Sequence, residues 1–354
     1  MSKMTGQERM LKVLNLEEPD RVPHWDTVHP RVKDAILPGS SFPEFTDYID
    51  LDAVGNFDKV NAWSYESVDT DKRIRRDQWG GLVQYTTETL GHPMEPAIKT
   101  EADLDRYIPP DPDEEWRYET IRRLLKRYKG NRAVYAHATD VFDIASDSLL
   151  GPEAYYNAMI KNPALVDRVN DIVLDFNLAY LKNCLELGVD YIYISGDFAM
   201  TKGPMVSPKH TARFLTPPLK KQVDLAREYN VPVLKHTDGN IWKIFDLIVD
   251  TGINALHPID PIAGMDLGEV KAKYGDRLCL AGNVNCGATL SWGSVQDVRR
   301  EVKDCIRKAG PGGGFICTSG NSIHSGVKPE NYLAMVKAIH EFGLYPLDME
   351  RLES

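Results

Sequence analysis

The sequence predicts an α/β fold, a (β/α)8 TIM barrel with an N-terminal helical extension and a long insertion after the second strand. Two observations lead to this prediction. Eight short apolar runs, most of them ending in polar residues, recur along the chain, and segments with helical periodicity lie between most of them. Strands that alternate with helices pair in parallel. Eight such units in 354 residues suit one barrel, so we expect a single domain spanning residues 1–354.

The chain is expected to begin with a helix in TGQERMLKVLNL, capped by Thr5. The apolar runs then predict eight strands, at Arg21–Asp26, Leu51–Phe57, Ala133–Thr139, Tyr191–Asp197, Val231–Asn240, Ile253–Asp260, Leu278–Asn285 and Gly314–Asn321. The insertion, roughly residues 58–130, is rich in Trp, Tyr, Asp and Pro. Long connections on the active-site side of a barrel are usually functional, so we expect the insertion to form part of the active-site wall.

Helical periodicity predicts the main helices that follow, at Pro163–Leu187 with Gly188 as its end, Pro208–Tyr229, Ser294–Ala309 and Lys328–Phe342. The glycine run GPGGGF, Gly310–Phe315, resembles a phosphate loop at first sight. It precedes the last strand, however, and therefore belongs to the face opposite the active site. A tight helix-to-strand turn is the better interpretation.

Composition excludes several classes of protein. The net charge of −10 argues against a nucleic-acid-binding protein. The apolar runs are too short to span a membrane and we find no secretory leader, so we expect a soluble cytoplasmic protein. The five cysteines show no CxxC spacing, which indicates reduced thiols.

The strand ends predict where the active site lies, because barrel enzymes build their sites where strands exit at the C-terminal face. In VPVLKHTDGN, His236 and Asp238 are two residues apart, so both side chains can face the same way and form half of a metal site. Cys317 lies near the end of the last strand, where a thiolate could reach a metal held by His236.

Other polar residues also fall at predicted strand exits. Histidines occur there at His24, His137, His236 and His257, and His324 follows the last strand. Any one of them could instead be a buried structural histidine. The exits also carry Asp197, Asn283 and Asn321. These three side chains could bind substrate or form hydrogen bonds along the rim of the barrel.

Several segments resemble the uroporphyrinogen decarboxylase superfamily. The resemblance lies in VPVLKHTDGNIW, in INALHPIDPIAGMDLGEVKAKYGDRLCLAGNVNC and in PGGGFICTSGNSIHSGVKPENYLAMV. RVPHWD and RRDQWGGLVQY resemble the methyltransferase branch of that superfamily. Its decarboxylases carry an arginine-rich motif, RQAGRY, just after the first strand, to hold substrate carboxylates. Here that place reads HWDTVHPRVK, so the resemblance argues against porphyrinogen decarboxylation.

The methyltransferase branch, by resemblance, uses zinc to move methyl groups to or from a corrinoid. Members that methylate coenzyme M are expected to bind zinc through a His-x-Cys pair and a later Cys. This chain keeps His236 but has Asp238 at the first cysteine position and Asn321 at the second, with Cys317 four residues earlier. Oxygen ligands leave a harder cation, which suits an oxygen substrate better than a thiol.

We therefore expect the first methyltransferase of an O-demethylase system, which takes a methyl group from a methoxylated aromatic compound of the veratrol or guaiacol type. The expected acceptor is the Co(I) corrinoid of a separate small protein, because the DxHxxG signature of corrinoid-binding domains does not occur here. Zn²⁺, or an acid such as Asp238 in its place, would polarise the ether oxygen. Aromatic residues that would suit a flat apolar ring are Trp25, Phe57, Trp63, Tyr65, Trp79, Phe142 and Phe198.

The residues are assigned to three roles. The catalytic candidates are His236, Asp238 and Asp197. The substrate-binding candidates are Trp25, Phe57, His137, Phe198, His257, Asn283, Asn321 and His324. The metal-ligand candidates are His236, Asp238 and Cys317.

Three alternatives remain open. One is a lyase that acts on a small aromatic or tetrapyrrole carboxylic acid, with Asp238 or Asp197 as proton donor. Another is a thiol methyltransferase of the coenzyme M type. The last is a barrel that binds a corrinoid or porphyrin without catalysis.

Overall fold

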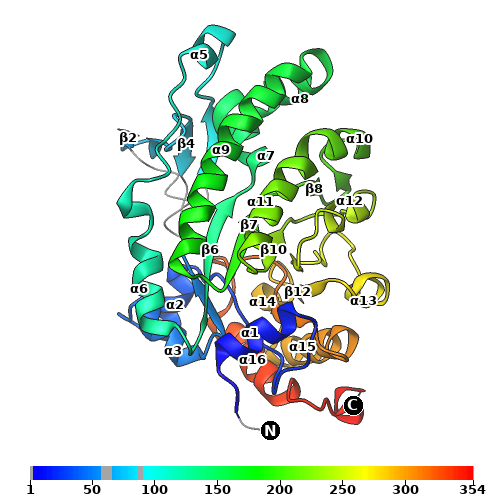
Figure 1. The fold of residues 1–354 in the computed structure, drawn as a ribbon. Coiled ribbons are helices and arrows are strands. Elements are labelled where there is room, and N and C mark those ends of the chain that lie inside the picture. Colours follow the sequence, from blue (N-terminus) through cyan, green and yellow to red (C-terminus); the bar gives the residue numbers. More distant parts are fainter. Residues whose placement is uncertain (1–2, 57–65, 86–90, 354) are drawn as a thin grey trace.

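The computed structural model describes residues 3–56, 66–85 and 91–353. Its centre is a curled sheet of seven parallel strands, coloured from blue to red along the chain in Figure 1. In spatial order these strands are β1 (Ala53–Gly55), β6 (Ala133–Thr139), β7 (Tyr191–Ser195), β10 (Val233–His236), β11 (Ala255–His257), β12 (Cys279–Val284) and β13 (Phe315–Ser319). Spatial order follows chain order, as expected when each strand is joined to the next by a helical crossover.

The first predicted strand, Arg21–Asp26, does not form a ladder. It makes one isolated bridge, between Arg21 and Leu344. The same segment nevertheless joins the two edges of the sheet: the Cys317 N–H donates to the carbonyl of Pro23, and the Asp52 N–H donates to the carbonyl of His24. Pro23 has no N–H of its own, which interrupts the ladder at this point. The prediction of eight laddered strands is therefore wrong for this segment.

The two faces of the sheet pack against different layers. Side chains on the inner face form a core with the N-terminal helix α1 (Gly6–Leu14), which contributes Met10, Val13 and Leu14. Thr5 caps this helix through a capping box with Glu8, as predicted for Thr5. The outer face packs against the long helices α9 (Pro163–Leu187), α11 (Thr216–Glu228), α13 (Leu267–Tyr274), α15 (Val295–Ala309) and α16 (Pro329–Phe342).

The periodicity of the sequence predicts α9, α11, α15 and α16, whereas α13 was not predicted. Helix α9 has the predicted bounds, and Gly188 follows it with a φ of 86°. The segment predicted as one helix from Pro208 is instead α10 (Pro208–His210), a π-helical turn η3 (Thr211–Leu215) and α11. The remaining helices are α2 (Pro30–Ile36), α3 (Phe42–Ile49), α7 (Val141–Asp143), the π-helix η2 (Ile144–Leu150), α8 (Pro152–Lys161), α12 (Phe245–Val249), α14 (Thr289–Trp292) and α17 (Met349–Glu353).

The insertion contains a small sheet that the sequence analysis does not predict. Its four antiparallel strands are β2 (Glu66–Asp69), β3 (Ile74–Arg76), β4 (Leu82–Tyr85) and β5 (Gly91–Glu95), followed by α5 (Glu101–Asp105), the 3-10 turn η1 (Glu115–Arg117) and α6 (Glu119–Tyr128). A further two-stranded hairpin, β8 (Ala199–Met200) and β9 (Gly203–Pro204), follows β7.

The glycine run before β13 is a turn, as predicted. Gly312, Gly313 and Gly314 all have positive φ, and a Cβ on Gly313 would lie 2.5 Å from the backbone of Glu17. Glycine is thus required where this turn meets the N-terminal segment.

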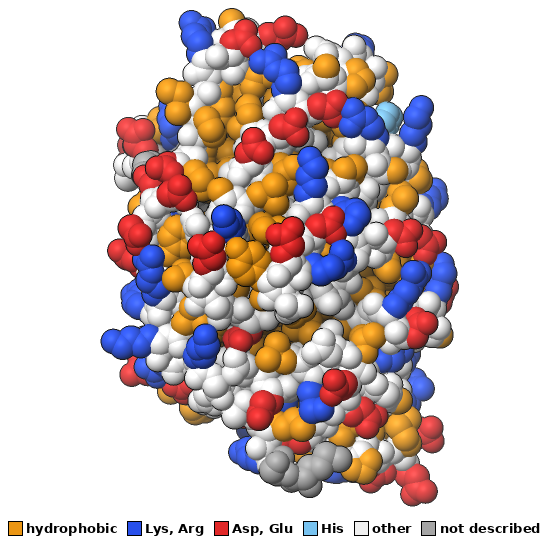
Figure 2. Space-filling view, in the orientation of Figure 1, with side chains coloured by type: hydrophobic (Ala, Val, Ile, Leu, Met, Phe, Trp, Pro, Cys, Tyr) orange, Lys and Arg blue, Asp and Glu red, His pale blue; other side chains and the backbone are white. Residues whose placement is uncertain are grey.

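In the part of the chain that the structure describes, no helix has the length and apolar character needed to cross a bilayer. Figure 2 shows acidic and basic side chains intermixed over one face, with apolar side chains exposed between them.

Candidate active site

Four polar side chains lie in one register row at the carboxyl ends of neighbouring strands. Thr139 pairs with Ser195, Ser195 with His236, and His236 with His257. Because paired residues of a sheet point to the same face, this row lines one mouth. The cavity there is lined by Trp25, Asp26, Thr27, Thr139, Asp143, Tyr193, Ser195, Gly196, Asp197, His236, Asp238, His257, Thr318, Ser319, Asn321 and Ser322.

Within this cavity Asp197, His236 and Asp238 form a compact cluster. One ligand atom of each residue lies within 4.8 Å of the others. His236 Nε2 is 3.7 Å from a carboxylate oxygen of Asp197 and 3.7 Å from Asp238 Oδ1. The backbone N–H of Asp238 also donates to Asp197 Oδ1 at 2.8 Å, which ties the ends of β7 and β10 together. The structure thus brings together the three residues predicted to be catalytic.

A second histidine determines which nitrogen of His236 carries its proton. His257 Nε2 lies 3.2 Å from the carbonyl oxygen of Ser319, and a carbonyl can only accept, so Nε2 carries hydrogen. Burial, and after it the neighbouring His236, lower the pKa of His257 well below its ordinary value, so the ring is neutral and its Nδ1 is an acceptor. His236 Nδ1, 2.7 Å away, must therefore donate to it. This leaves a lone pair on His236 Nε2, directed at the two carboxylates.

Asp238 has one satisfied and one unsatisfied oxygen. Its Oδ2 accepts a hydrogen bond from the side-chain amide of Asn321. Its Oδ1 is buried and has no hydrogen-bond partner. Burial, reinforced by Asp197, raises the pKa of Asp238 well above its ordinary value. A buried oxygen without a partner is costly, and here it faces another lone pair rather than a donor.

These atoms fit a divalent cation. A lone pair on imidazole and two carboxylate oxygens are ligands that Zn²⁺ accepts, and three protein ligands leave a coordination position open for substrate. The bond from His236 to His257 is the kind of support that orients histidine ligands in metal sites. The fit rests on the unsatisfied Asp238 Oδ1 and on the deduced tautomer of His236.

Cys317 does not join this cluster, which corrects its prediction as a metal ligand. Its side chain packs in the outer core with the helices, whereas Ile316, its neighbour on β13, packs in the inner core. Successive residues of a strand point to opposite faces, so a ligand on the inner face could not come from position 317. Burial raises the pKa of the Cys317 thiol well above its ordinary value, which disfavours a thiolate.

Asn283 also points outward rather than into the cavity. Its amide donates to the carbonyl of Ile259 at 2.8 Å, and its oxygen accepts from the Cys305 thiol. His324 lies in a loop, 3.3 Å from Ser291 Oγ, and accepts from the N–H of Gly326, so its role is local. The prediction that Asn283 and His324 bind substrate is corrected by these positions.

Of the predicted aromatic residues, Trp25 lines the cavity. Its ring packs edge-on against Tyr193, 5.1 Å away, and against His257, 5.7 Å away. Phe198 is fully buried beneath the ammonium of Lys235 instead of facing the cavity, which corrects its prediction as a substrate contact. Trp79 packs against Phe176, and Phe142 against Phe198 and Tyr155. Phe57, Trp63 and Tyr65 lie outside the described residues.

His137 lies one layer behind the cavity. Its Nε2 is 2.6 Å from the hydroxyl of Ser195, which does line the cavity. Burial lowers the pKa of His137 to about 3, so the ring is neutral. His137 therefore supports Ser195 rather than contacting a substrate directly. His24 lies elsewhere, 3.1 Å from His340.

Asp26, Asp143 and Tyr193 are among the cavity-lining residues that were not predicted from the sequence. Asp26 ends the RVPHWD run, and its Oδ1 accepts hydrogen bonds from the N–H and hydroxyl of Ser319 and from the hydroxyl of Thr318. Burial raises the pKa of Asp26 to about 6. Burial, followed by repulsion from Asp197 and Asp140, raises the pKa of Asp143 well above its ordinary value. The strand-end position of Asp26 was a usable signal, whereas Asp143 follows a strand by four residues and gives none.

Comparison with known proteins identifies the family. A family model described as uroporphyrinogen decarboxylase (URO-D) matches residues 5–342. The chain belongs to the uroporphyrinogen decarboxylase family. Its curated relatives include the uroporphyrinogen decarboxylase of Psychromonas ingrahamii, 28% identical over 280 residues, with 75% of each chain covered. That of Thioalkalivibrio sulfidiphilus is 25% identical, with 75% of this chain and 76% of the relative covered.

Solved structures share the fold of this family member. A methyltransferase from Methanosarcina mazei superposes with a TM-score of 0.75 at 21% sequence identity. The superposition covers 96% of this chain and 99% of the methyltransferase chain. A B12-independent methionine synthase from Shewanella superposes with a TM-score of 0.52 at 9% identity, covering 92% and 93%. At these identities the likeness concerns the fold alone.

Proposed function

We propose that this member of the uroporphyrinogen decarboxylase family is the methyltransferase of an O-demethylase system. It moves a methyl group from a methoxylated aromatic compound to the Co(I) corrinoid of a separate small corrinoid protein in the cytoplasm. The bond between the methyl carbon and the ether oxygen breaks, a bond between that carbon and cobalt forms with the electron pair of Co(I), and the oxygen leaves as a phenolate that takes up a proton. The observation that carries the proposal is the Asp197–His236–Asp238 cluster, with its unsatisfied oxygen and free imidazole lone pair.

Zn²⁺ bound by Asp197, His236 and Asp238 would supply Lewis-acid polarisation of the ether oxygen. The protein's own residues do the rest. His257 holds the tautomer of His236, and Asn321 holds one oxygen of Asp238. Trp25 and Tyr193 form an apolar wall beside the cluster, suited to a flat ring. Positioning donor and acceptor in line is the main catalytic task of such a site.

The architecture supports the same proposal. The segment around Pro23 bonds to Cys317 on one side and, through His24, to Asp52 on the other. We propose that this segment takes the place of the eighth strand and closes a (β/α)8 barrel. In such barrels active sites lie at the C-terminal face, which is where Asp197, His236 and Asp238 lie.

A decarboxylase is the second candidate function, because the curated relatives carry that name. Asp238 or Asp197 would then serve as proton donor. Among the described residues that line the cavity there is neither lysine nor arginine. A substrate with several carboxylates would find no cationic partner there, so the cavity favours the methyltransferase. The Asp238 and Asn321 positions, which lack thiols, likewise favour an oxygen substrate over a thiol.

The test is an anaerobic assay with Co(I) corrinoid, free or on its carrier protein, against a panel of methoxyarenes, following cobalt absorbance for methylcobalt formation. His236→Ala should abolish methylation without altering circular dichroism. The matched control is His210→Ala, an exchange in the short helix α10 outside the cavity, which should leave the rate unchanged. No methylcobalt from any donor with zinc present, or full activity in H236A, would refute the proposal.

A further inference from the structure

The charge of the cavity wall is unusual for a site that accepts an aromatic acid. Four of its described lining residues are aspartates, Asp26, Asp143, Asp197 and Asp238, and none is lysine or arginine. The face of the molecule shown in Figure 2 carries both acidic and basic side chains, in contrast to this cavity wall.

The nearest basic side chain on the strand that carries His236 is unavailable to a substrate. Lys235 is fully buried and points to the opposite side of β10 from His236. Its ammonium is 3.0 Å from Asp140 Oδ2 and 2.8 Å from the carbonyl of Gly196. Lys235 is also absent from the cavity lining.

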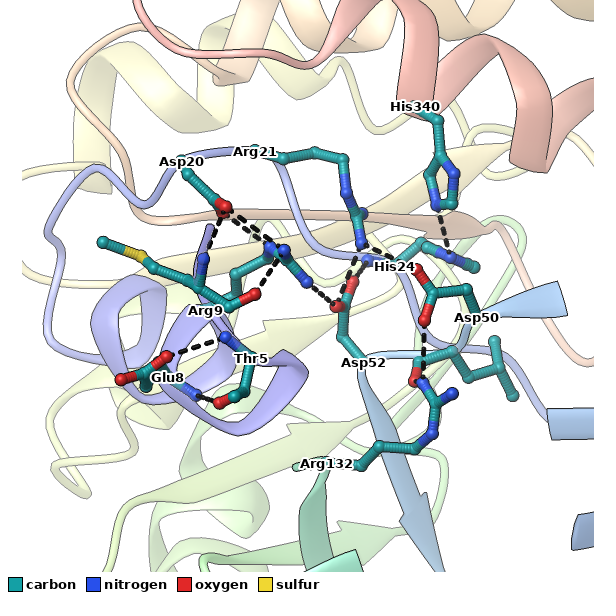
Figure 3. Close-up of polar contacts among 12 residues, drawn as sticks. Thr5, Glu8, Arg9, Asp20, Arg21, His24, Asp50, Asp52, Arg132 and His340 are labelled. Atoms are coloured by element: carbon teal, nitrogen blue, oxygen red, sulfur yellow. Dashed lines mark hydrogen bonds and ion pairs between the residues drawn. The ribbon is translucent and has the colours of Figure 1, made fainter. Parts of the chain in front are cut away.

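The arginines near the first predicted strand, Arg21–Asp26, already bind protein carboxylates. Arg9 and Arg21 both bond to Asp52, which precedes β1 and so lies at the amino end of the sheet (Figure 3). Arg132 bonds to Asp50 and to the carbonyl of Leu51 in the same region. These guanidinium groups therefore pair with protein carboxylates at the amino end of the sheet, opposite the mouth of the cavity, and are not available to a substrate.

A bound divalent cation would not change this conclusion. Its two charges would be matched by those of Asp197 and Asp238, leaving Asp26 and Asp143 as the other ionisable acids of the wall. Neither acid brings a positive charge to the wall. Burying a substrate carboxylate there without a cationic partner is unfavourable.

We infer that the methyl donor is an uncharged methoxyarene and that ring carboxylates are excluded from this site, because the described cavity wall offers them no cationic partner. This inference rests on the proposed function and narrows its substrate class.

Three donors of matched shape test the inference. Guaiacol is uncharged, vanillate adds a ring carboxylate to it, and vanillamide replaces that carboxylate by an uncharged amide of similar size. Binding of each is measured by calorimetry with zinc-loaded protein, independently of turnover. We expect vanillate to bind at least about tenfold more weakly than vanillamide. Equal affinities for vanillate and vanillamide would overturn the inference. If both bound more weakly than guaiacol by the same factor, the size of the ring substituent and not its charge would determine binding.

Methyl transfer from each donor to cobalt is measured in parallel. The proposed function and the preference for an uncharged donor can then be refuted independently of each other. If none of the three donors methylates cobalt, the proposed function fails, while the binding ratio still decides the charge preference. If vanillate is a good methyl donor, the methyltransferase stands and the uncharged-donor inference falls.

Discussion

His236 and His257 share a single hydrogen between their Nδ1 atoms, which lie 2.7 Å apart. The carbonyl of Ser319 holds the other nitrogen of His257 and so determines the direction of that bond. A residue that does not touch the proposed metal thus decides which nitrogen of His236 faces it.

Exchange of His257 for phenylalanine should therefore weaken metal binding. His257→Phe keeps the ring volume but removes the acceptor, so His236 loses its fixed tautomer. We expect zinc affinity to fall by about 10–100-fold, measured by competition with a chromophoric chelator. His324→Phe, a histidine outside the cavity, is the control and should bind zinc normally. Parent-like affinity in H257F would show that the tautomer is set in another way.

Exchange of Cys317, unlike that of His257, should leave metal binding unchanged. Because its thiol faces the outer core, Cys317→Ala should retain full zinc content and zinc affinity. The loss of a buried sulfur should lower the free energy of unfolding by about 1–2 kcal/mol. Metal analysis after dialysis and urea unfolding measure the two effects. Loss of zinc from a folded C317A protein would return Cys317 to the ligand set.

Acid should destabilise the protein through buried histidines. Burial lowers the pKa of His340 to about 4, from an ordinary value near 6.5 in the unfolded chain. Between these values the unfolded state binds a proton that the folded state does not, so the free energy of unfolding falls as the pH falls from about 6.5 to about 4. Urea unfolding across this range measures the slope.

His340→Gln should reduce that slope, because one depressed histidine is removed while a polar side chain remains beside His24. The comparison with the parent protein isolates His340 from the other buried histidines, whose contributions are common to both. An identical slope in the two proteins would contradict the lowered pKa.

The buried carboxylate of Asp52 should be important for stability. It accepts from Arg9 at 2.9 Å and from Arg21 at 3.1 Å, and it receives the N–H of His24 (Figure 3). Asp52→Asn removes the charge that two buried guanidinium groups share. Arg9 keeps Asp20 at 2.6 Å, but Arg21 keeps only Asp50, at 3.9 Å. The exchange should therefore cost about 3 kcal/mol of unfolding free energy.

The matched control for Asp52 is Asp105→Asn, which breaks an exposed pair with Arg168. Such surface pairs contribute about 0–1 kcal/mol. Chemical denaturation should separate the two variants clearly. Equal stability of D52N and D105N would show that the Asp52 network contributes little.

Much of the fold follows from the sequence because strands buried on both faces are written as continuous apolar runs. Ala133–Thr139 and Phe315–Ser319 are examples, and both are buried throughout. The small sheet of the insertion lacks this signal, since three of the four residues of Glu66–Asp69 are exposed. The first predicted strand lacks a regular ladder because Pro23 has no N–H to donate. The apolar pattern alone does not show whether every N–H is available.

The site was predictable where spacing alone decides. His236 and Asp238 share a face because they are two residues apart, and Asp197 ends a neighbouring strand. Cys317 was misplaced because a shift by one position turns a side chain to the other face, and an apolar run does not show which face is inside. Asn283 differs, because by strand alternation it should face inward like Cys279 and Ala281. The chain leaves that alternation at Gly282, with a φ of 139°, and the amide of Asn283 turns outward. Asp143 needed the path of the chain after β6, which no local pattern encodes.

The described part of the insertion does not line the cavity, although residues 57–65 lie outside the description. Within it, Leu124 and Tyr128 of α6 instead line a neighbouring hollow beside Trp25 and Asp26. Among the described residues, the wall of the cavity is made by strand ends and the turns that follow them, and a contribution from the insertion stays a prediction.

The bonds of Pro23 and His24 bear on how the protein is made. The ribosome produces this segment before its neighbour Cys317, which is synthesised almost three hundred residues later, as the numbering shows. Until β13 emerges, the segment has only one of its two edges to bind, and α1 has no complete inner core to cover. The sheet can therefore close only when the chain between Pro23 and β13 has been made.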